Sequence, residues 1–132
     1  MEVKVLAIDD QEIILLALER RLGELGYQVK TTDSGEKGIQ LFHSFVPDLV
    51  LVDINMPGIS GLDVVRYIRN ECDSNTPIIV VSGNIDENVI DEGFELGIDD
   101  YMRKPVSIDE LHVRISRIIG IPIVDRNALE NV

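Results

Sequence analysis

The stretch DLVLVD at residues 48–53 decides the fold class, because it holds an unbroken apolar run between two acids. An unbroken run, as opposed to an alternating one, is typical of a strand covered by helices on both faces, as in a parallel sheet. We therefore expect a strand over 48–52, with Asp53 directly after it. Working outward, four similar runs are KVLAI at 4–8, QVKT at 28–31, IIVV at 78–81 and DYM at 100–102.

The segments between these runs have helical periodicity and recognisable ends. The first helix carries an apolar stripe that Gly26 can end, and the fifth opens on a capping box from Ser107 to Glu110 and stops at Gly120. Candidate N-caps for the second, third and fourth helices are Asp33 or Ser34, Ser60 and Asp86. The pattern predicts an α/β fold of the (βα)5 type.

Length and composition fit one folded domain in the cytoplasm. The 132 residues are 45% hydrophobic and 27% charged, which are ordinary values for a globular domain. No apolar run approaches the roughly 18 residues that cross a bilayer, and the start MEVKVLAIDD lacks the layout of a secretory signal. A net charge of −12 would repel a phosphate backbone, so we expect no direct nucleic-acid binding by this segment.

We expect the domain to span residues 1–120, with 121–132 as a tail or the start of a linker. The tail, IPIVDRNALENV, lies outside the βα pattern but is too apolar for a solvated end. It can begin a connector to an output domain, with Asp125 capping a new helix, or pack back on the domain. The lone Cys72 has no partner for a disulfide, and His43 and His112 are expected on the surface.

Polar residues follow four of the five predicted strands. Each has an ordinary explanation, since acids and serines cap helices and lysines are usually solvated. A parallel sheet, however, brings the carboxyl ends of its strands to one edge, where three carboxylates would repel one another unless a cation joined them. Mg²⁺ suits such oxygen ligands, and phosphoryl transfer gives every member a role. These residues are Asp9, Asp10, Asp53, Ser82 and Lys104.

The motifs at these positions resemble those of the response regulator receiver family of two-component signalling. They are Asp9-Asp10, DINMPG at 53–58 followed by Gly61, Ser82-Gly83, and DYMRKP at 100–105, and the resemblance covers residues 3 to about 119. It implies a flavodoxin-like, three-layer sandwich whose parallel strands lie in the order 2-1-3-4-5. Gly58 and Gly61 flank a turn where a positive φ or a close backbone approach would suit glycine.

The resemblance also implies a role for each residue of the site. Asp53 resembles the phosphoacceptor, and Lys104 resembles the lysine that pairs with the phosphoryl group. The implied magnesium ligands are Asp10, Asp53 and the backbone carbonyl of Asn55, with Asp9 acting through water.

The same likeness implies a switch and a set of partners. Ser82 would bond a phosphoryl oxygen and make room into which Tyr101 turns, and Lys104-Pro105 would be a cis peptide. The surface of the fourth helix, fifth strand and fifth helix would report this change, and it can pair two copies of the chain. The phosphodonor would be a sensor histidine kinase or a histidine phosphotransfer protein docking near the first helix. The chain would then be a signalling switch that catalyses its own phosphorylation and dephosphorylation, not an enzyme with a separate substrate.

Three other functions remain open from the residues. A receiver fold can signal by protein contact alone, although such relatives lose an acid or the lysine, and this chain keeps all five residues. A flavodoxin-like domain can bind FMN, but the acidic loop DDQE after the first strand is a poor phosphate cradle. A phosphatase of the haloacid dehalogenase type needs a second acid where this chain has Asn55.

Overall fold

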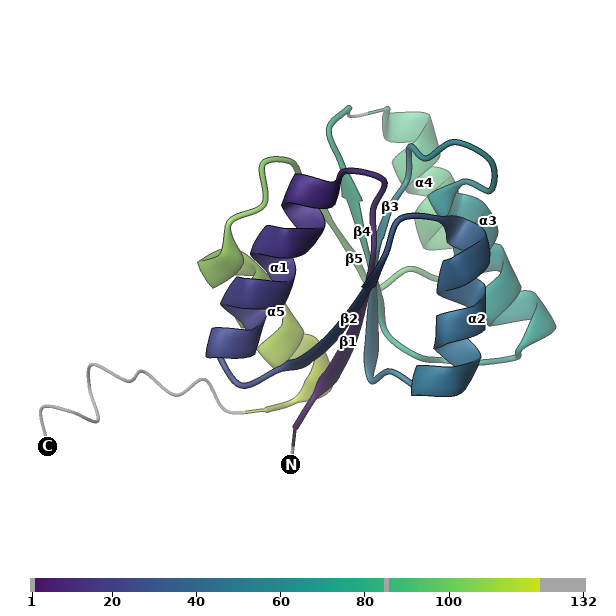
Figure 1. Ribbon diagram of the computed structural model, residues 1–132. Coiled ribbons are helices and arrows are strands. Elements are labelled where there is room, and N and C mark those ends of the chain that lie inside the picture. Colours follow the sequence, from purple (N-terminus) through teal and green to yellow (C-terminus); the bar gives the residue numbers. More distant parts are fainter. Residues whose placement is uncertain (1, 85, 122–132) are drawn as a thin grey trace, which may run out of the picture.

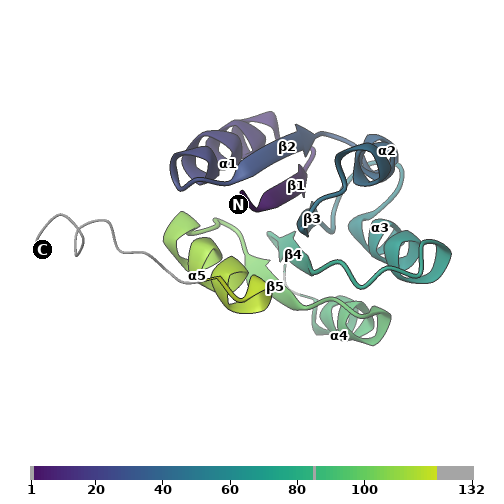
Figure 2. The same cartoon turned by 90° about the horizontal axis from the view of Figure 1, so that it is seen from below.

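The computed structural model describes residues 2–84 and 86–121 and shows a five-stranded parallel sheet between two layers of helices. The strands lie in the order β2-β1-β3-β4-β5, so the predicted α/β sandwich and strand order are confirmed. Helices α1 and α5 cover one face, and α2, α3 and α4 cover the other (Figures 1 and 2). The strands are β1 Lys4–Ile8, β2 Gln28–Thr32, β3 Leu49–Asp53, β4 Ile78–Ser82 and β5 Asp100–Arg103. The helices are α1 Glu12–Glu24, α2 Gly35–Phe45, α3 Gly61–Arg66, the π-helix η1 Tyr67–Glu71, α4 Glu87–Leu96 and α5 Ile108–Ile119.

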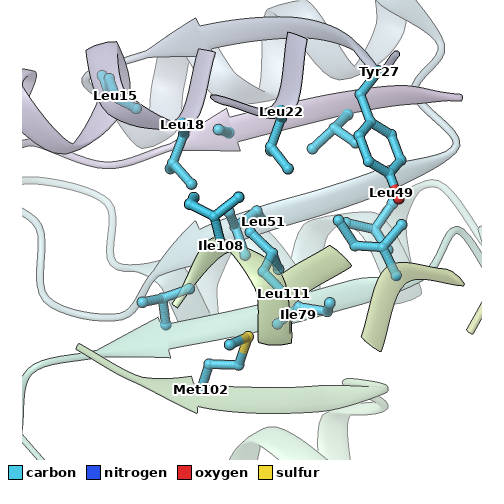
Figure 3. Packing of buried hydrophobic residues seen from close by; sticks show 14 residues of the cluster. Leu15, Leu18, Leu22, Tyr27, Leu49, Leu51, Ile79, Met102, Ile108 and Leu111 are labelled. Atoms are coloured by element: carbon cyan, nitrogen blue, oxygen red, sulfur yellow. The ribbon is translucent and has the colours of Figure 1, made fainter. Parts of the chain in front are cut away.

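Alternate residues of the strands feed two separate hydrophobic cores, because successive side chains of a strand point to opposite faces. The α1/α5 core joins β-strand residues to the inner stripes of α1 and α5, and Figure 3 shows Leu18 and Leu22 pointing from α1 toward Leu111. This core consists of Val5, Ala7, Leu15, Leu18, Leu22, Tyr27, Leu49, Leu51, Ile79, Val81, Met102, Ile108, Leu111 and Ile115. The α2–α4 core on the other face consists of Leu6, Ile8, Val50, Val52, Ile54, Met56, Val64, Val65, Ile68, Ile78, Val80 and Ile98.

Strand register sets the position of the polar groups. Asp53 pairs with Val81, and Ser82 pairs with Arg103, so the carboxyl ends of β3, β4 and β5 are level with one another. Asp53 and Ser82 are the last residues of their strands, whereas the predicted strands ended one residue earlier, at 52 and 81. This one-residue difference keeps their backbones in the sheet and fixes the direction of their side chains.

Most predicted helix starts are confirmed. Ser34, Ser60, Asp86 and Ser107 are N-caps whose side chains accept backbone N–H bonds. The reciprocal capping box, however, forms at Ser60 and Asp63. At Ser107 only the bond from the Glu110 N–H is present, because the Glu110 carboxylate accepts from Arg114 Nη2 at 2.6 Å instead.

In the described chain, no helix is both long and apolar enough to cross a bilayer. The predicted linker and its cap at Asp125 lie outside the described residues and stay predictions.

Candidate functional site

Lys104, just after β5, joins two buried acids at the carboxyl edge of the sheet. Its Nζ lies 2.8 Å from Asp9 Oδ2 and 3.1 Å from Asp53 Oδ2. Both acids are only 4% exposed, so they lie in a poorly hydrated position where an unpaired charge is costly. The short distances make Lys104 the direct counter-ion of both carboxylates. The Lys104-Pro105 peptide is cis, as predicted.

Three carboxylates gather here, as the order of the strands predicted. One oxygen each from Asp9, Asp10 and Asp53 lies within 4.8 Å of the others, and Asp10 is exposed. Three negative charges against the single ammonium of Lys104 leave an excess that a divalent cation would neutralise. Hard oxygen donors with one open side fit Mg²⁺, which keeps several waters and takes one or two carboxylates from a protein.

The pKa values of Asp53 and Lys104 are both raised, but for different reasons. Burial raises the pKa of Asp53, although Lys104 and the Asn55 N–H both act to lower it, and the charge of Asp9 adds to the rise. At Lys104, burial acts to lower the pKa, but the hydrogen bonds to Asp9 and Asp53 outweigh it and raise the pKa. Lys104 is therefore firmly cationic, while the Asp53 carboxylate is held charged at a cost in folding free energy.

Ser82 and two asparagines flank Asp53 on the other side. Ser82 is 2% exposed, and its Oγ donates to the Asn84 carbonyl at 2.7 Å. The Asn55 N–H donates to Asp53 Oδ1 at 3.1 Å, and Asn55 Nδ2 lies 3.5 Å from Ser82 Oγ. The hydroxyl proton of Ser82 is thus engaged with the β4–α4 loop in this conformation.

A hollow of about 510 Å³ opens above these groups, so Asp53 can be reached from solvent although it is buried. Such a hollow has room for a phosphoryl group with its waters. Its lining residues are Asp10, Gln11, Ile14, Asp53, Asn55, Gly83, Asn84, Lys104 and Pro105.

Two glycines behind Asp53 have the backbone roles that the sequence predicted. Gly58 has a φ of +79°, a conformation that L side chains rarely adopt. At Gly61, a Cβ would collide with the backbone carbonyl of Asp53, and the Gly61 N–H donates to the Ile54 carbonyl at 3.1 Å. The loop from β3 to α3 therefore passes close enough to fix the position of Asp53.

Tyr101 lies on β5, on the side of α4, and is partly exposed. Its ring meets the ring of Phe94 edge to face, with centroids 6.5 Å apart. Arg114 Nη1 donates to the Tyr101 carbonyl and to the Asp100 carboxylate, all at 2.9 Å. Tyr101 is held at its backbone by Arg114 of α5 and at its ring by Phe94 of α4, and neither partner was predictable from the sequence pattern.

One residue of the site was missed altogether. Gln11 lies just after the predicted acid pair, and its Oε1 accepts a bond from Lys104 Nζ at 2.9 Å. Its position next to Asp10 was the only available signal, because a glutamine at a helix start has no distinctive pattern.

Comparison with known proteins gives one consistent family. The sequence model of the response regulator receiver domain matches residues 5–116. The chain is 42% identical over 118 residues to the "probable transcriptional regulator ycf27" of Guillardia theta, covering 88% of this chain and 45% of that protein. It is 38% identical over 117 residues to the "cell cycle transcriptional regulator CtrA" of Caulobacter vibrioides, covering 89% of this chain and 50% of that one. The chain thus spans about half the length of these curated relatives.

Solved structures agree with the fold. The chemotaxis protein CheY4 of Vibrio cholerae superimposes with a TM-score of 0.84 at 26% identity, over 89% of this chain and 99% of that one. The Francisella response regulator 1452 receiver domain gives 0.83 at 29% identity, over 90% and 98%.

Proposed function

The chain belongs to the response regulator receiver domain family, and on that premise we propose that it is a switch phosphorylated on Asp53. The donor is the phosphohistidine of a sensor histidine kinase or a histidine phosphotransfer protein. The observation that carries the proposal is the position of Asp53, which is bonded to Lys104, adjoins Asp9 and Asp10, and lines a hollow. Family membership sets aside the flavin-binding and dehalogenase-type alternatives.

The proposed reaction is an in-line displacement at phosphorus. An oxygen of the Asp53 carboxylate forms the new P–O bond, and the P–N bond of phosphohistidine breaks. With the donor ring protonated at its other nitrogen, the electron pair of that bond leaves on a neutral imidazole. Lys104 remains protonated and neutralises the phosphoryl oxygens. Asp10, Asp53 and the Asn55 carbonyl would hold Mg²⁺, with Asp9 acting through water, and the bound ion would supply further positive charge at those oxygens. Hydrolysis of the acyl phosphate by water later restores Asp53.

The switch begins at Ser82. Phosphorylation adds roughly −1.5 to −2 charges, which attract hydroxyl and ammonium donors. Ser82 then leaves the Asn84 carbonyl, where it is bonded at 2.7 Å, and donates to a phosphoryl oxygen. The space it leaves admits the ring of Tyr101, which must slide off Phe94. The phosphorylated state thereby biases a pre-existing equilibrium at the α4-β5-α5 surface.

Helix α1 provides the docking surface for the phosphodonor. Ile13 and Leu16 are 78% and 59% exposed. Large exposed apolar side chains side by side on one helix mark an interaction surface. Ile14 of the same helix lines the hollow above Asp53, so a donor resting on α1 can present its phosphohistidine to that acid.

We place the chain in the cytoplasm, with an output domain after residue 120. The longer relatives are named transcriptional regulators. A further domain would supply the contact with DNA that we do not expect from this acidic segment. Two copies can pair through α4, β5 and α5 when phosphorylated.

The test compares the wild-type chain with Asp53→Asn after incubation with Mg²⁺ and a small phosphodonor such as acetyl phosphate. Intact mass should show one added phosphoryl group, removable by hydroxylamine as expected of an acyl phosphate, on the wild type and none on the variant. Asp109→Asn, at an exposed acid of α5, is the matched control and should react like the wild type. Equal uptake by wild type and Asp53→Asn would refute the assignment, and no uptake by any chain would favour a receiver that signals by contact alone.

A further inference from the structure

Gln11 occupies the N-cap of α1 without capping it. Its backbone has the extended conformation of an N-cap, with φ −94° and ψ 104°, but its side chain makes no capping hydrogen bond. The other four α-helices of the described chain begin at Ser34, Ser60, Asp86 and Ser107, and each of these side chains accepts a backbone N–H. Ser, Thr, Asp and Asn are the favoured N-caps, and a residue outside that group weakens the helix start. Among the α-helices of the described chain, only α1, which begins just after Asp9 and Asp10, breaks this local rule.

The Gln11 side chain reaches across to β5 instead. Its Oε1 accepts a hydrogen bond from Lys104 Nζ at 2.9 Å, over a separation of 93 residues in sequence. A lysine ammonium has three N–H donors, and here three oxygens receive them. The other two are Asp9 Oδ2 at 2.8 Å and Asp53 Oδ2 at 3.1 Å. Gln11 is the one neutral member of this set.

The position of Gln11 differs from that of the two acids. Asp9 and Asp53 are buried, whereas Gln11 is exposed and lines the hollow above Asp53. Gln11 adds a third acceptor on a side chain that lines the hollow, and Lys104 and Asp53 line the same hollow. The ammonium is thereby held beside the space that a phosphoryl group would enter. A neutral amide can do this without adding to the crowded negative charge.

We propose that Gln11 is a positioning residue that holds the Lys104 ammonium beside the hollow, where it can contact the incoming phosphoryl group. This inference rests on the function proposed above for Asp53. The start of α1 is then less stable than it would be with a capping residue at position 11, as is typical where a local rule is broken at a functional site.

Two substitutions separate the helix cap from the lysine contact. Gln11→Ser removes the acceptor and installs a good N-cap, so Tm should rise by roughly 2–6 °C while phosphorylation of Asp53 by acetyl phosphate slows roughly three- to tenfold. Gln11→Met keeps the length and lacks both the acceptor and a cap. It should slow the reaction equally and leave Tm within about 1 °C of the wild type, because neither side chain caps the helix.

A measurement on the metal-free, unphosphorylated chain tests the contact itself. In ¹⁵N NMR of the lysine side chains, the Lys104 ammonium should give a signal sharpened by its hydrogen bonds, and both variants should broaden or shift it. A phosphorylation rate within twofold of the wild-type rate in both variants, or an unchanged Lys104 signal, overturns this inference and leaves the proposed function standing. A wild-type chain that takes up no phosphoryl group overturns the proposed function and this inference with it.

Discussion

The α1/α5 core and the two acids bound by Lys104 at the edge of the sheet are both largely buried, but they contribute to stability with opposite signs. In the core, Leu22, Leu111 and Ile115 are 0% exposed and belong to one cluster of buried hydrophobic residues. At the edge, Asp9 and Asp53 are 4% exposed and share one lysine. Burial of large aliphatic side chains stabilises a fold by roughly 1.5–3 kcal/mol each, whereas buried like charges cost stability unless they are fully paired. The chain therefore gains stability in the α1/α5 core and gives some of it up at the edge where we propose that it is phosphorylated.

The largest expected effect comes from breaking the core. Leu111→Ala removes a fully buried side chain of α5 and leaves a cavity against Leu22 and Ile79, so the free energy of unfolding should fall by about 3–5 kcal/mol. Urea denaturation followed by circular dichroism measures it. Ile13→Ala, at a 78% exposed position of α1, is the matched control and should stay within about 0.5 kcal/mol of the wild type. A loss below about 1 kcal/mol for Leu111→Ala would contradict the view that this face carries the stability.

The second prediction concerns the charged edge, where a bound divalent cation would neutralise the acids. If the acids form a divalent site, Mg²⁺ at ten times its Kd should raise the free energy of unfolding by about 1.4 kcal/mol, since it binds the folded chain only. Asp10→Asn removes an exposed ligand and should abolish most of this gain. NaCl at matched ionic strength controls for screening. A gain of equal size in the Asp10→Asn variant or with NaCl would show that the ion acts on general surface charge.

Sequence reasoning succeeded where the signals were local or followed from topology. The sequence placed all five strands to within one residue at each end. The signal was strongest for β3 and β4, whose unbroken apolar runs match strands buried at every position. Parallel strands then required Asp9, Asp53, Ser82 and Lys104 to share one edge, and the structure brings them together. The position of Gly61 at a turn after DINMPG predicted a backbone role, and the structure shows that a Cβ there would have no space.

What failed depends on side chains whose direction no pattern sets. The contact between Gln11 and Lys104 joins the start of α1 to the end of β5 through two long side chains. Residue spacing does not reveal such a contact. His112 was expected on the surface, but it is partly buried and its Nδ1 lies 2.7 Å from the Tyr27 hydroxyl. The π-helix at Tyr67–Glu71 was unforeseen as well, because one wide turn leaves the apolar stripe nearly unchanged.

The smallest effect should have the opposite sign to that of the core substitution. Asp53→Asn keeps the shape of the side chain and removes one buried charge, while Lys104 keeps Asp9 and Gln11 as partners. The free energy of unfolding at pH 7 and without divalent ions should rise by on the order of 1 kcal/mol, typical of a stabilising substitution at a strained site. Urea denaturation at several pH values measures both the gain and its pH dependence.

The pH dependence follows from the raised pKa of Asp53, which burial lifts above its ordinary value of 3.8. In the window above 3.8 the folded chain holds this proton more tightly than the unfolded chain, so the wild type loses stability as pH rises through the folded-state pKa. The Asp53→Asn variant has no such ionisation. Its advantage should be complete above the folded-state pKa of Asp53, shrink as the pH falls through that pKa, and vanish only below the ordinary value of 3.8. Asp109→Asn, at an exposed acid, should show no such advantage at any pH. An Asp53→Asn chain less stable than the wild type at pH 7 would mean that the Lys104 ion pair outweighs burial, and that the charged edge stabilises the fold as the core does.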